Sequence, residues 1–360
     1  MDLDEELEAW MTLSLAPGLS ADAFRRLLVA FGGPLQILGA KRAALTQVVP
    51  APAADAVLAP APREAMQAVG AWLDDPANRL ITYADSAYPL ALLQIPDPPP
   101  VLYAKGRVEL LNGWALAIVG SRNATGQGVE HAESFARVLS DAGLTIVSGL
   151  AQGIDTAAHR GGLQGKGSSI AVVGTGLDTV YPARNRDLAH ELAARGCLIS
   201  EFPLGTPPVA TNFPRRNRLI SGLARGCLVV EAALLSGSLI TARLANEQGK
   251  DVFAIPGSIH SALSKGCHAL IKQGAKLVET AHDVLDELGM GTSAPKPRNE
   301  PRVELDADPL LEALGFDPCD IDTLSARSGV AAQDVAAKLT RWEIDGVIEA
   351  LPGGRYQRIR

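Results

Sequence analysis

Residues 115–149, ALAIVGSRNATGQGVEHAESFARVLSDAGLTIVSG, contain one complete strand–helix–strand pattern. An uninterrupted apolar run stands at each end, and the segment 127–140 between them has apolar residues at helical spacing. Apolar runs without alternation are typical of strands that are buried on both faces, as in a parallel sheet covered by helices. The stretch therefore predicts one β–α–β unit of a parallel sheet.

The same pattern continues on the C-terminal side of this unit. Further apolar runs that end in small or acidic residues lie at 169–176, 196–201, 226–232 and 251–257. Amphipathic segments lie at 154–164, 184–195, 238–248 and 265–274. Strands that alternate with helices in this way predict a doubly wound α/β domain with a mostly parallel sheet.

The flanks of this region have different patterns. Short helices are expected over residues 5–48, and the Pro/Ala-rich segment 50–62 is predicted to be a connector. At the C-terminal end, two short helices, a turn at Gly329, a longer helix and a hairpin around Gly353 predict a winged helix-turn-helix. We predict four parts: a helical N-terminal domain at 1–65, an extended α/β domain at 66–288 with its core at 111–280, a linker at 289–303 and a winged helix at 304–360.

Composition excludes several classes of protein. The longest uncharged apolar runs are shorter than the roughly 18–20 residues that a membrane span requires. Acidic residues stand near the N-terminus where a secretory signal would carry Lys or Arg. The four cysteines contain no Cys-x-x-Cys pair, which argues against the usual zinc spacings and a disulfide scaffold and fits a reducing compartment. We therefore expect a cytoplasmic protein with no membrane span, no metal and no cofactor.

The charge is unevenly distributed along the chain. The formal net charge is −7, and residues 1–110 and 281–360 contribute −5 and −6. Residues 111–280 contain 16 Lys and Arg against 12 Asp and Glu, a net charge of +4. An anionic partner is therefore expected to bind the central domain.

Two strand ends of this domain carry groups that suit an anion. One apolar run leads into Gly120, Ser121 and Arg122, and the next leads into Ser148 and Gly149. Ligands of open parallel sheets bind at the carboxyl ends of the strands, where glycines admit the ligand and helix N-termini favour negative charge. The loops match neither the dinucleotide fingerprint nor the Walker A motif. Turn chemistry alone is the alternative explanation.

The segment TNFPRRNR, residues 211–218, is the strongest local feature. Phe213 stands beside Arg215, Arg216 and Arg218 in what we predict to be a Pro-bounded loop. Arginines beside an exposed ring suit single-stranded nucleic acid, because phosphates bind the guanidinium groups and a base stacks on the ring. In the alternative, Phe213 belongs to the core and the arginines pair with Glu201 and Glu231.

Two other groups have a plain structural explanation. Asp155 and His159 are four residues apart, and we interpret them as a helix-start acid and a packed histidine, because no nucleophile is evidently placed with them. The hydroxyl-rich segment 236–241 can hold phosphate or simply cap a helix.

The central domain closely resembles the DNA-processing protein A family, also called Smf. The resemblance is carried by AIVGSR (117–122), IVSGLAQGIDTAAH (146–159), AVVGTGLDTVYPARN (171–185), LISEFPLG (198–205), FPRRNRLISGL (213–223), VVEAALLSGSLITARLA (229–245), VFAIPGS (252–258) and LIKQGAKLV (270–278). It implies a Rossmann-like domain that binds single-stranded DNA, forms a homodimer and helps to load RecA onto DNA during natural transformation.

The resemblance also implies the DNA-binding residues. A phosphate pocket falls on Gly120, Ser121, Arg122, Ser148 and Gly149, with Phe213, Arg215, Arg216 and Arg218 alongside; Gln152 and Arg184 complete the candidate set. Gln152 is a departure, because the family often has Arg at this position. The pair Cys267-His268 is a second departure.

An enzyme is the main alternative. Nucleotide phosphoribohydrolases share this kind of sheet, but they need a positioned carboxylate at a PGGxGT-type loop, and the corresponding segment here is SGSLITA, with only Glu231 upstream. A protein without catalytic activity is therefore favoured. A third possibility makes the winged helix a duplex-binding regulator, although its net negative charge favours a protein-interaction or accessory module.

Overall fold

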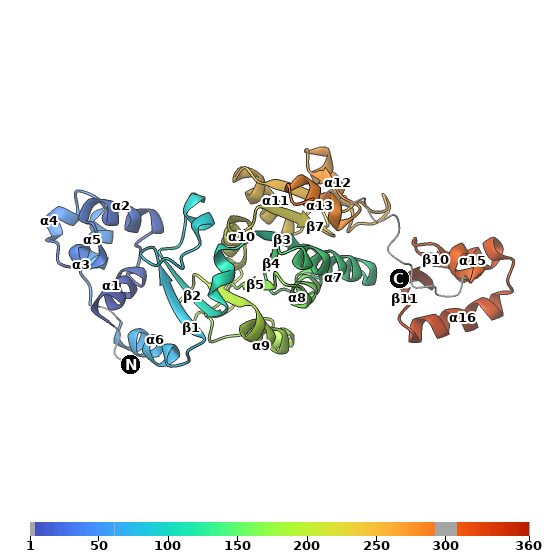
Figure 1. Ribbon diagram of the computed structural model, residues 1–360, viewed down its shortest axis with the longest axis horizontal. Helices are drawn as coiled ribbons and strands as arrows, with labels where there is room; N and C mark the ends of the chain where they lie inside the picture. Colours follow the sequence, from blue (N-terminus) through green and yellow to red (C-terminus); the bar gives the residue numbers. More distant parts are fainter. Residues whose placement is uncertain (1–3, 61, 292–307, 360) are drawn as a thin grey trace.

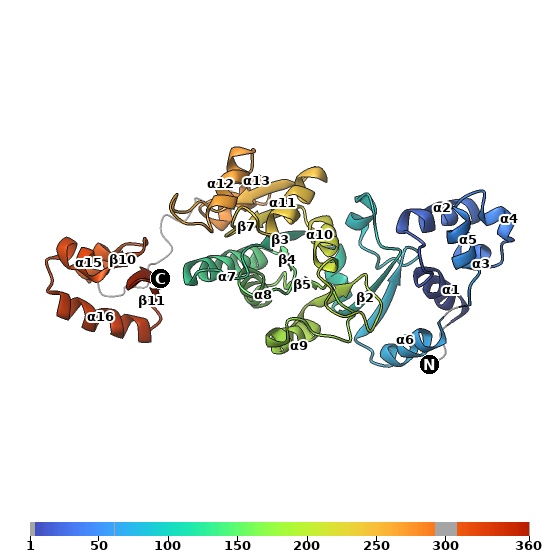
Figure 2. The same ribbon diagram turned by 180° about the vertical axis from the view of Figure 1, so that it is seen from behind.

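The computed structural model describes residues 4–60, 62–291 and 308–359. The parts follow one another along the long axis of the molecule (Figure 1), with the N-terminal helices at one end, the sheet in the middle and the winged helix at the other end. The view from behind shows the same arrangement (Figure 2). None of the helices in the described part of the chain is long and apolar enough to cross a membrane.

The central sheet has nine strands in the order β1-β2-β6-β5-β4-β3-β7-β8-β9. Seven of them are parallel: β3 (Ala115–Val119), β4 (Thr145–Ser148), β5 (Ser169–Val172), β6 (Cys197–Ser200), β7 (Gly226–Val229), β8 (Asp251–Ala254) and β9 (Lys276–Leu277). An antiparallel pair, β1 (Asn78–Thr82) and β2 (Val101–Gly106), extends the sheet beyond β6. The predicted doubly wound, mostly parallel sheet is confirmed.

Helices cover both faces of the sheet. One face packs against α10 (Asn212–Leu223), α11 (Ser238–Glu247) and α12 (Lys265–Lys272). The other packs against α7 (Gly126–Asp141), α8 (Ile154–Gln164), α9 (Arg186–Arg195) and α13 (Ala281–Glu287). Short 3-10 helices lie at η1 (Leu90–Gln94), η2 (Val108–Asn112) and η3 (Ala183–Asn185).

One part of the sequence prediction for this domain was wrong. Residues 212–218, expected to form a loop, lie in α10, and Thr211 precedes this helix as its N-cap. Pro214 is compatible with this helix because it lies in the first turn, where a backbone N–H has no partner within the helix. The second half of α10 is held by Leu219, Ile220 and Leu223, which are buried against the sheet.

The N-terminal part consists of short helices, as predicted. They are α1 (Glu5–Ser14), α2 (Ala21–Phe31), α3 (Pro34–Leu38), α4 (Arg42–Leu45), α5 (Ala51–Val57) and α6 (Arg63–Leu73). The prediction of a connector at 50–62 was wrong for residues 51–57, which form the helix α5. Its Ala53, Ala54 and Val57 are buried in the same apolar cluster as Trp10. Alanine is the strongest helix former, and Pro52 lies in the first turn of α5, where a helix tolerates proline, so the composition of this segment is compatible with a helix.

The C-terminal part is a winged helix, as predicted. It contains α14 (Pro309–Leu314), β10 (Cys319–Asp320), α15 (Ile321–Ser328), α16 (Ala332–Ile344), β11 (Ile348–Leu351) and β12 (Arg355–Arg358). Gly329 ends α15 with a φ of 71°, which favours glycine.

Most of the predicted linker, 292–303, lies outside the described residues. The wing contacts the central domain, where both carboxylate oxygens of Glu349 accept from the backbone N–H of Gly126 at 3.0 Å.

Candidate nucleic-acid interface

A cavity of about 740 Å³ opens at the carboxyl end of β3. This strand has β4 on one side and β7 on the other, and α7 and α10 lie on opposite faces of the sheet. It is the topological switch point, where ligands of open α/β sheets bind. The walls include Ser121, Arg122, Phe213, Arg216, Ser238 and Thr241.

The loop after β3 is held in place by Glu231. The backbone N–H of Ser121 donates to the carbonyl oxygen of Glu231 at 2.7 Å, and the Glu231 carboxylate accepts from the N–H of Thr125 at 3.0 Å and from its hydroxyl at 2.6 Å. Burial raises the pKa of Glu231. Gly120 has no room for a side chain, since a Cβ there would lie 2.6 Å from the Ile154 side chain. Glu231, the carboxylate that left an enzyme conceivable, is thus engaged in positioning this loop.

Two rings and a guanidinium meet at the mouth of the cavity. The Arg122 guanidinium carbon lies 5.9 Å from the centroid of the Phe213 ring, and the Tyr181 ring centroid lies 5.6 Å from it. Phe213 is half-buried and belongs to none of the apolar core clusters of the described residues. Tyr181 is 46% exposed, which leaves a face for a ligand. Sequence reasoning missed Tyr181, although it stands in the YPARN segment that carries the resemblance.

The helical phase of α10 separates its three arginines. Arg215 and Arg218, three residues apart, lie on one side of the helix and reach the buried Glu201 carboxylate at 3.1 and 2.6 Å. Arg216 points the other way and lines the cavity, with only 4% of its surface exposed. The alternative pairing with Glu201 therefore holds for two arginines, whereas Glu231 binds the loop after β3.

Ser148 and Gly149, at the carboxyl end of β4, do not line the cavity themselves. The Ser148 hydroxyl donates to the carbonyl oxygen of Ile118 at 2.7 Å, so it is engaged inside the sheet. A Cβ built on Gly149 would overlap the guanidinium of Arg216. The cavity lining contains Gly120, Ser121, Arg122, Phe213 and Arg216 from the candidate set. It does not contain Ser148, Gly149, Gln152, Arg184, Arg215 or Arg218.

The interpretation of Asp155 and His159 as structural groups is confirmed. The Asp155 carboxylate accepts from the N–H groups of Gly149 at 3.1 Å and Ala151 at 3.2 Å, and so fixes the turn after β4. His159 is fully buried, with Nε2 accepting from the N–H of Leu150 and Nδ1 bonded to the Ser169 hydroxyl. In the described part of the chain, no group of three His, Cys, Asp or Glu side chains forms a metal site.

Burial makes His159 a source of acid sensitivity. It lowers the pKa of the imidazole from 6.5 to about 3, so the unfolded chain takes up the proton first as the pH falls. The free energy of unfolding should therefore decrease between about pH 6.5 and 3, by up to about 1.4 kcal/mol per pH unit from this residue. Denaturant titrations at several pH values measure it, with His159→Gln as the control. The same pH dependence in both proteins would contradict the assignment.

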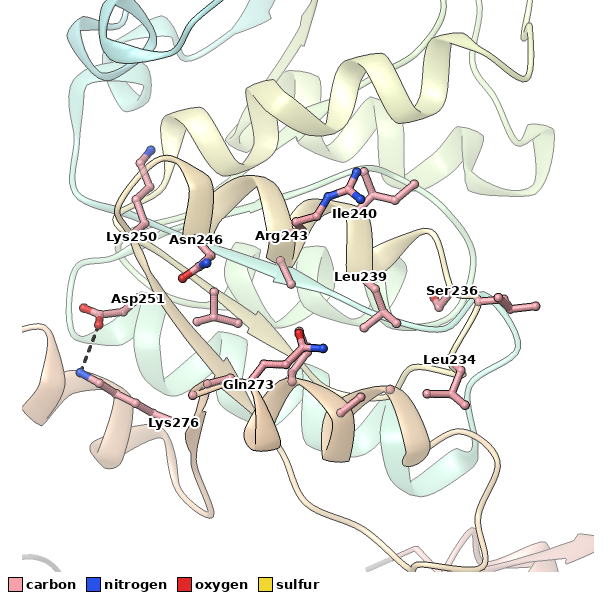
Figure 3. A pocket seen from close by; sticks show the side chains of 18 residues that line it. Leu234, Ser236, Leu239, Ile240, Arg243, Asn246, Lys250, Asp251, Gln273 and Lys276 are labelled. Atoms are coloured by element: carbon pink, nitrogen blue, oxygen red, sulfur yellow. Dashed lines mark ion pairs between the residues drawn. The ribbon is translucent and has the colours of Figure 1, made fainter.

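A second cavity, of about 590 Å³, lies between α11 and α12 (Figure 3). Its lining is mixed: Leu234 and Leu239 stand on one side, and the Asp251–Lys276 ion pair of 3.1 Å stands at the far end. Leu235, Ser236 and Ile240 line both cavities, so the start of α11 is the wall between them.

A mostly parallel sheet, with a ring-lined cavity that carries two arginines at its switch point, places the protein in the Rossmann-like class of α/β folds. The family model for DNA recombination-mediator protein A matches residues 79–289, and that for the DprA winged helix domain matches residues 294–354. The chain belongs to the DNA recombination-mediator protein A family.

Two relatives align in sequence with more than half of the chain. Protein Smf of Escherichia coli is 44% identical over 308 residues, which cover 83% of this chain and 82% of that protein. DNA processing protein DprA of Streptococcus pneumoniae is 50% identical over 203 residues, covering 56% of this chain and 72% of that protein.

Two solved structures are similar as well. That of the Streptococcus pneumoniae protein matches with a TM-score of 0.66 at 38% identity, covering 80% of this chain and 99% of that one. DNA processing protein A from Helicobacter pylori, described for its single-stranded DNA binding mode, matches with a TM-score of 0.54 at 31% identity, covering 58% of this chain and 95% of that one.

Proposed function

We propose that the cavity at the end of β3 binds single-stranded DNA without sequence preference. The observation that carries this proposal is the Arg122 guanidinium 5.9 Å from the half-buried Phe213 ring, with Tyr181 beside it. A guanidinium binds a phosphate and a ring stacks on a base, and every base offers a face for stacking. In a duplex the base faces are covered by their neighbours, so only a single strand can use both groups at once.

The first prediction concerns strand preference. Oligo-dT should bind more tightly than a duplex of matched length, and its affinity should fall as salt rises because neutralised phosphates release counterions. Fluorescence anisotropy with labelled oligonucleotides across a salt series measures both. Tighter binding to the duplex, or an affinity that salt does not change, would rule the proposal out.

We further propose that the protein acts in the cytoplasm, as a homodimer, to load RecA onto incoming single strands during natural transformation. The recombination-mediator family model and the DprA relatives support this role. Four buried cysteines without a disulfide agree with a reducing compartment. Sedimentation of the purified protein tests the dimer, and RecA filament formation on oligo-dT, with and without the protein, tests the loading.

We also propose that the protein does not hydrolyse nucleotides. Both oxygens of Glu231 accept hydrogen bonds from Thr125, which leaves this carboxylate engaged in the loop rather than presented to a ligand. Purified protein should therefore show no turnover of nucleoside monophosphates when product is followed by chromatography. Sustained turnover that Glu231→Gln abolishes would contradict this.

A further inference from the structure

Arg216 is a buried cation without a direct partner. Its side chain forms no hydrogen bond or ion pair with the described residues, and its Nε atom is buried and unsatisfied. Burial lowers the pKa of Arg216 to about 10, which still leaves the group charged at neutral pH. Asp155 lies close enough to attract it, but the Asp155 carboxylate accepts its hydrogen bonds from the backbone of the turn after β4. A buried guanidinium is costly unless it is paired, so this one is suited to a ligand that supplies the anion.

The start of α11 faces the same cavity. This helix has ten residues; its N-cap Gly237 has no side chain, and the Ser236 hydroxyl accepts from the backbone N–H of Ser238 at 3.3 Å. Ser238 and Thr241 line the cavity with 8% and 1% of their surfaces exposed, and the Ser238 hydroxyl lies 2.7 Å from that of Ser236. Hydroxyls and a helix N-terminus favour a phosphate.

The charges of the cavity are unbalanced. Arg122 and Arg216 both line it, so two positive charges face the same space. Asp155 is the one acid among the described lining residues. One phosphate at Arg122 would leave Arg216 and the start of α11 without an anion.

We propose that Arg216 and residues 236–241 form a second phosphate subsite, which holds the phosphodiester next to the one bound at Arg122. This inference rests on the proposed function and makes it more specific, because the cavity then takes two consecutive phosphates of one strand. The wall shared with the second cavity is thus part of the DNA site.

Salt dependence tests the subsite. Each phosphate contact of a single strand contributes about 0.7 to the slope of log K against log salt. Arg122→Gln and Arg216→Gln should each lower the slope by about one contact, and the double variant by about two. Arg137→Gln, an exposed arginine on α7, is the matched control and should leave the slope unchanged. If Arg216 only supports the fold, its loss weakens binding but leaves the slope as in the wild type, and the subsite is refuted.

Thr241→Val provides a variant that retains the shape of the side chain. It should weaken oligo-dT binding several-fold without changing the melting temperature, and binding equal to the wild type would refute the role of α11.

Thermal shifts with inorganic phosphate separate this proposal from the proposed function. Each single arginine variant should retain a phosphate-dependent rise in melting temperature, and the double variant should lose it. If oligo-dT does not bind but these thermal shifts appear, single-strand binding is wrong and the phosphate subsite stands. If oligo-dT binds and Arg216→Gln keeps the full salt slope, single-strand binding stands and the subsite is wrong.

Discussion

Arg122→Ala is expected to remove most of the affinity for single-stranded DNA. The guanidinium lies at the carboxyl end of β3 beside the Phe213 ring, where it can form charge-assisted hydrogen bonds with a phosphate. A hydrogen bond to a charged group contributes about 1.5–3 kcal/mol, so the loss should be roughly ten- to a hundredfold. The slope of log affinity against log salt should also become shallower by about one phosphate contact.

Anisotropy titrations and thermal melts together test the Arg122 prediction. Arg122 is exposed, so its replacement should change stability by no more than about 0.5 kcal/mol. Arg137→Ala, which removes an exposed arginine from α7, is the control for loss of one positive charge. An Arg122→Ala protein that binds oligo-dT like the wild type would show that the DNA lies elsewhere.

Phe213→Ala is expected to weaken binding in a different way. Stacking of one base on an aromatic ring contributes about 1–3 kcal/mol, whereas the ring neutralises no phosphate. Affinity should therefore fall by that amount with the salt slope almost unchanged. The melting temperature should change little, because Phe213 lies outside the core clusters of the described residues, whereas a core Phe→Ala costs about 3–5 kcal/mol.

Trp114→Ala is the matched control for Phe213. The Trp114 ring is 45% exposed, stacks against the Arg225 guanidinium and stands before β3, at the opposite end of this strand from the cavity. Its removal should leave DNA binding unchanged. A Phe213→Ala protein that melts far below the wild type would mean that the ring supports the fold.

The sequence pattern predicted the sheet well because buried parallel strands are encoded locally. The runs at 115–120 and 251–257 correspond to β3, which ends before Gly120, and to β8, which ends at Ala254, two residues before Pro256. The antiparallel addition of β1 and β2 was not predicted, because pairing between β2 and β6 joins residues about one hundred positions apart and has no local signal.

The site was predicted less completely than the fold. Three arginines and a proline indicated a loop at 211–218, and only the helical phase of α10 shows that Arg216 enters the cavity while Arg215 and Arg218 face Glu201. The contact between Tyr181 and Phe213 joins two segments whose proximity depends on the sheet order. Residue types at strand ends thus located the site, but which side chains line it depends on tertiary packing.

The overlap between position 149 and Arg216 links two segments that are distant in sequence. A methyl group on Gly149 would need the space that the Arg216 guanidinium occupies, so Gly149→Ala would displace the arginine without altering it. In a genetic screen, Gly149→Ala and a replacement of Arg216 should therefore give the same phenotype, although Gly149→Ala leaves every charged residue in place. The absence of a side chain at Gly149 is therefore what leaves room for the Arg216 guanidinium beside the cavity.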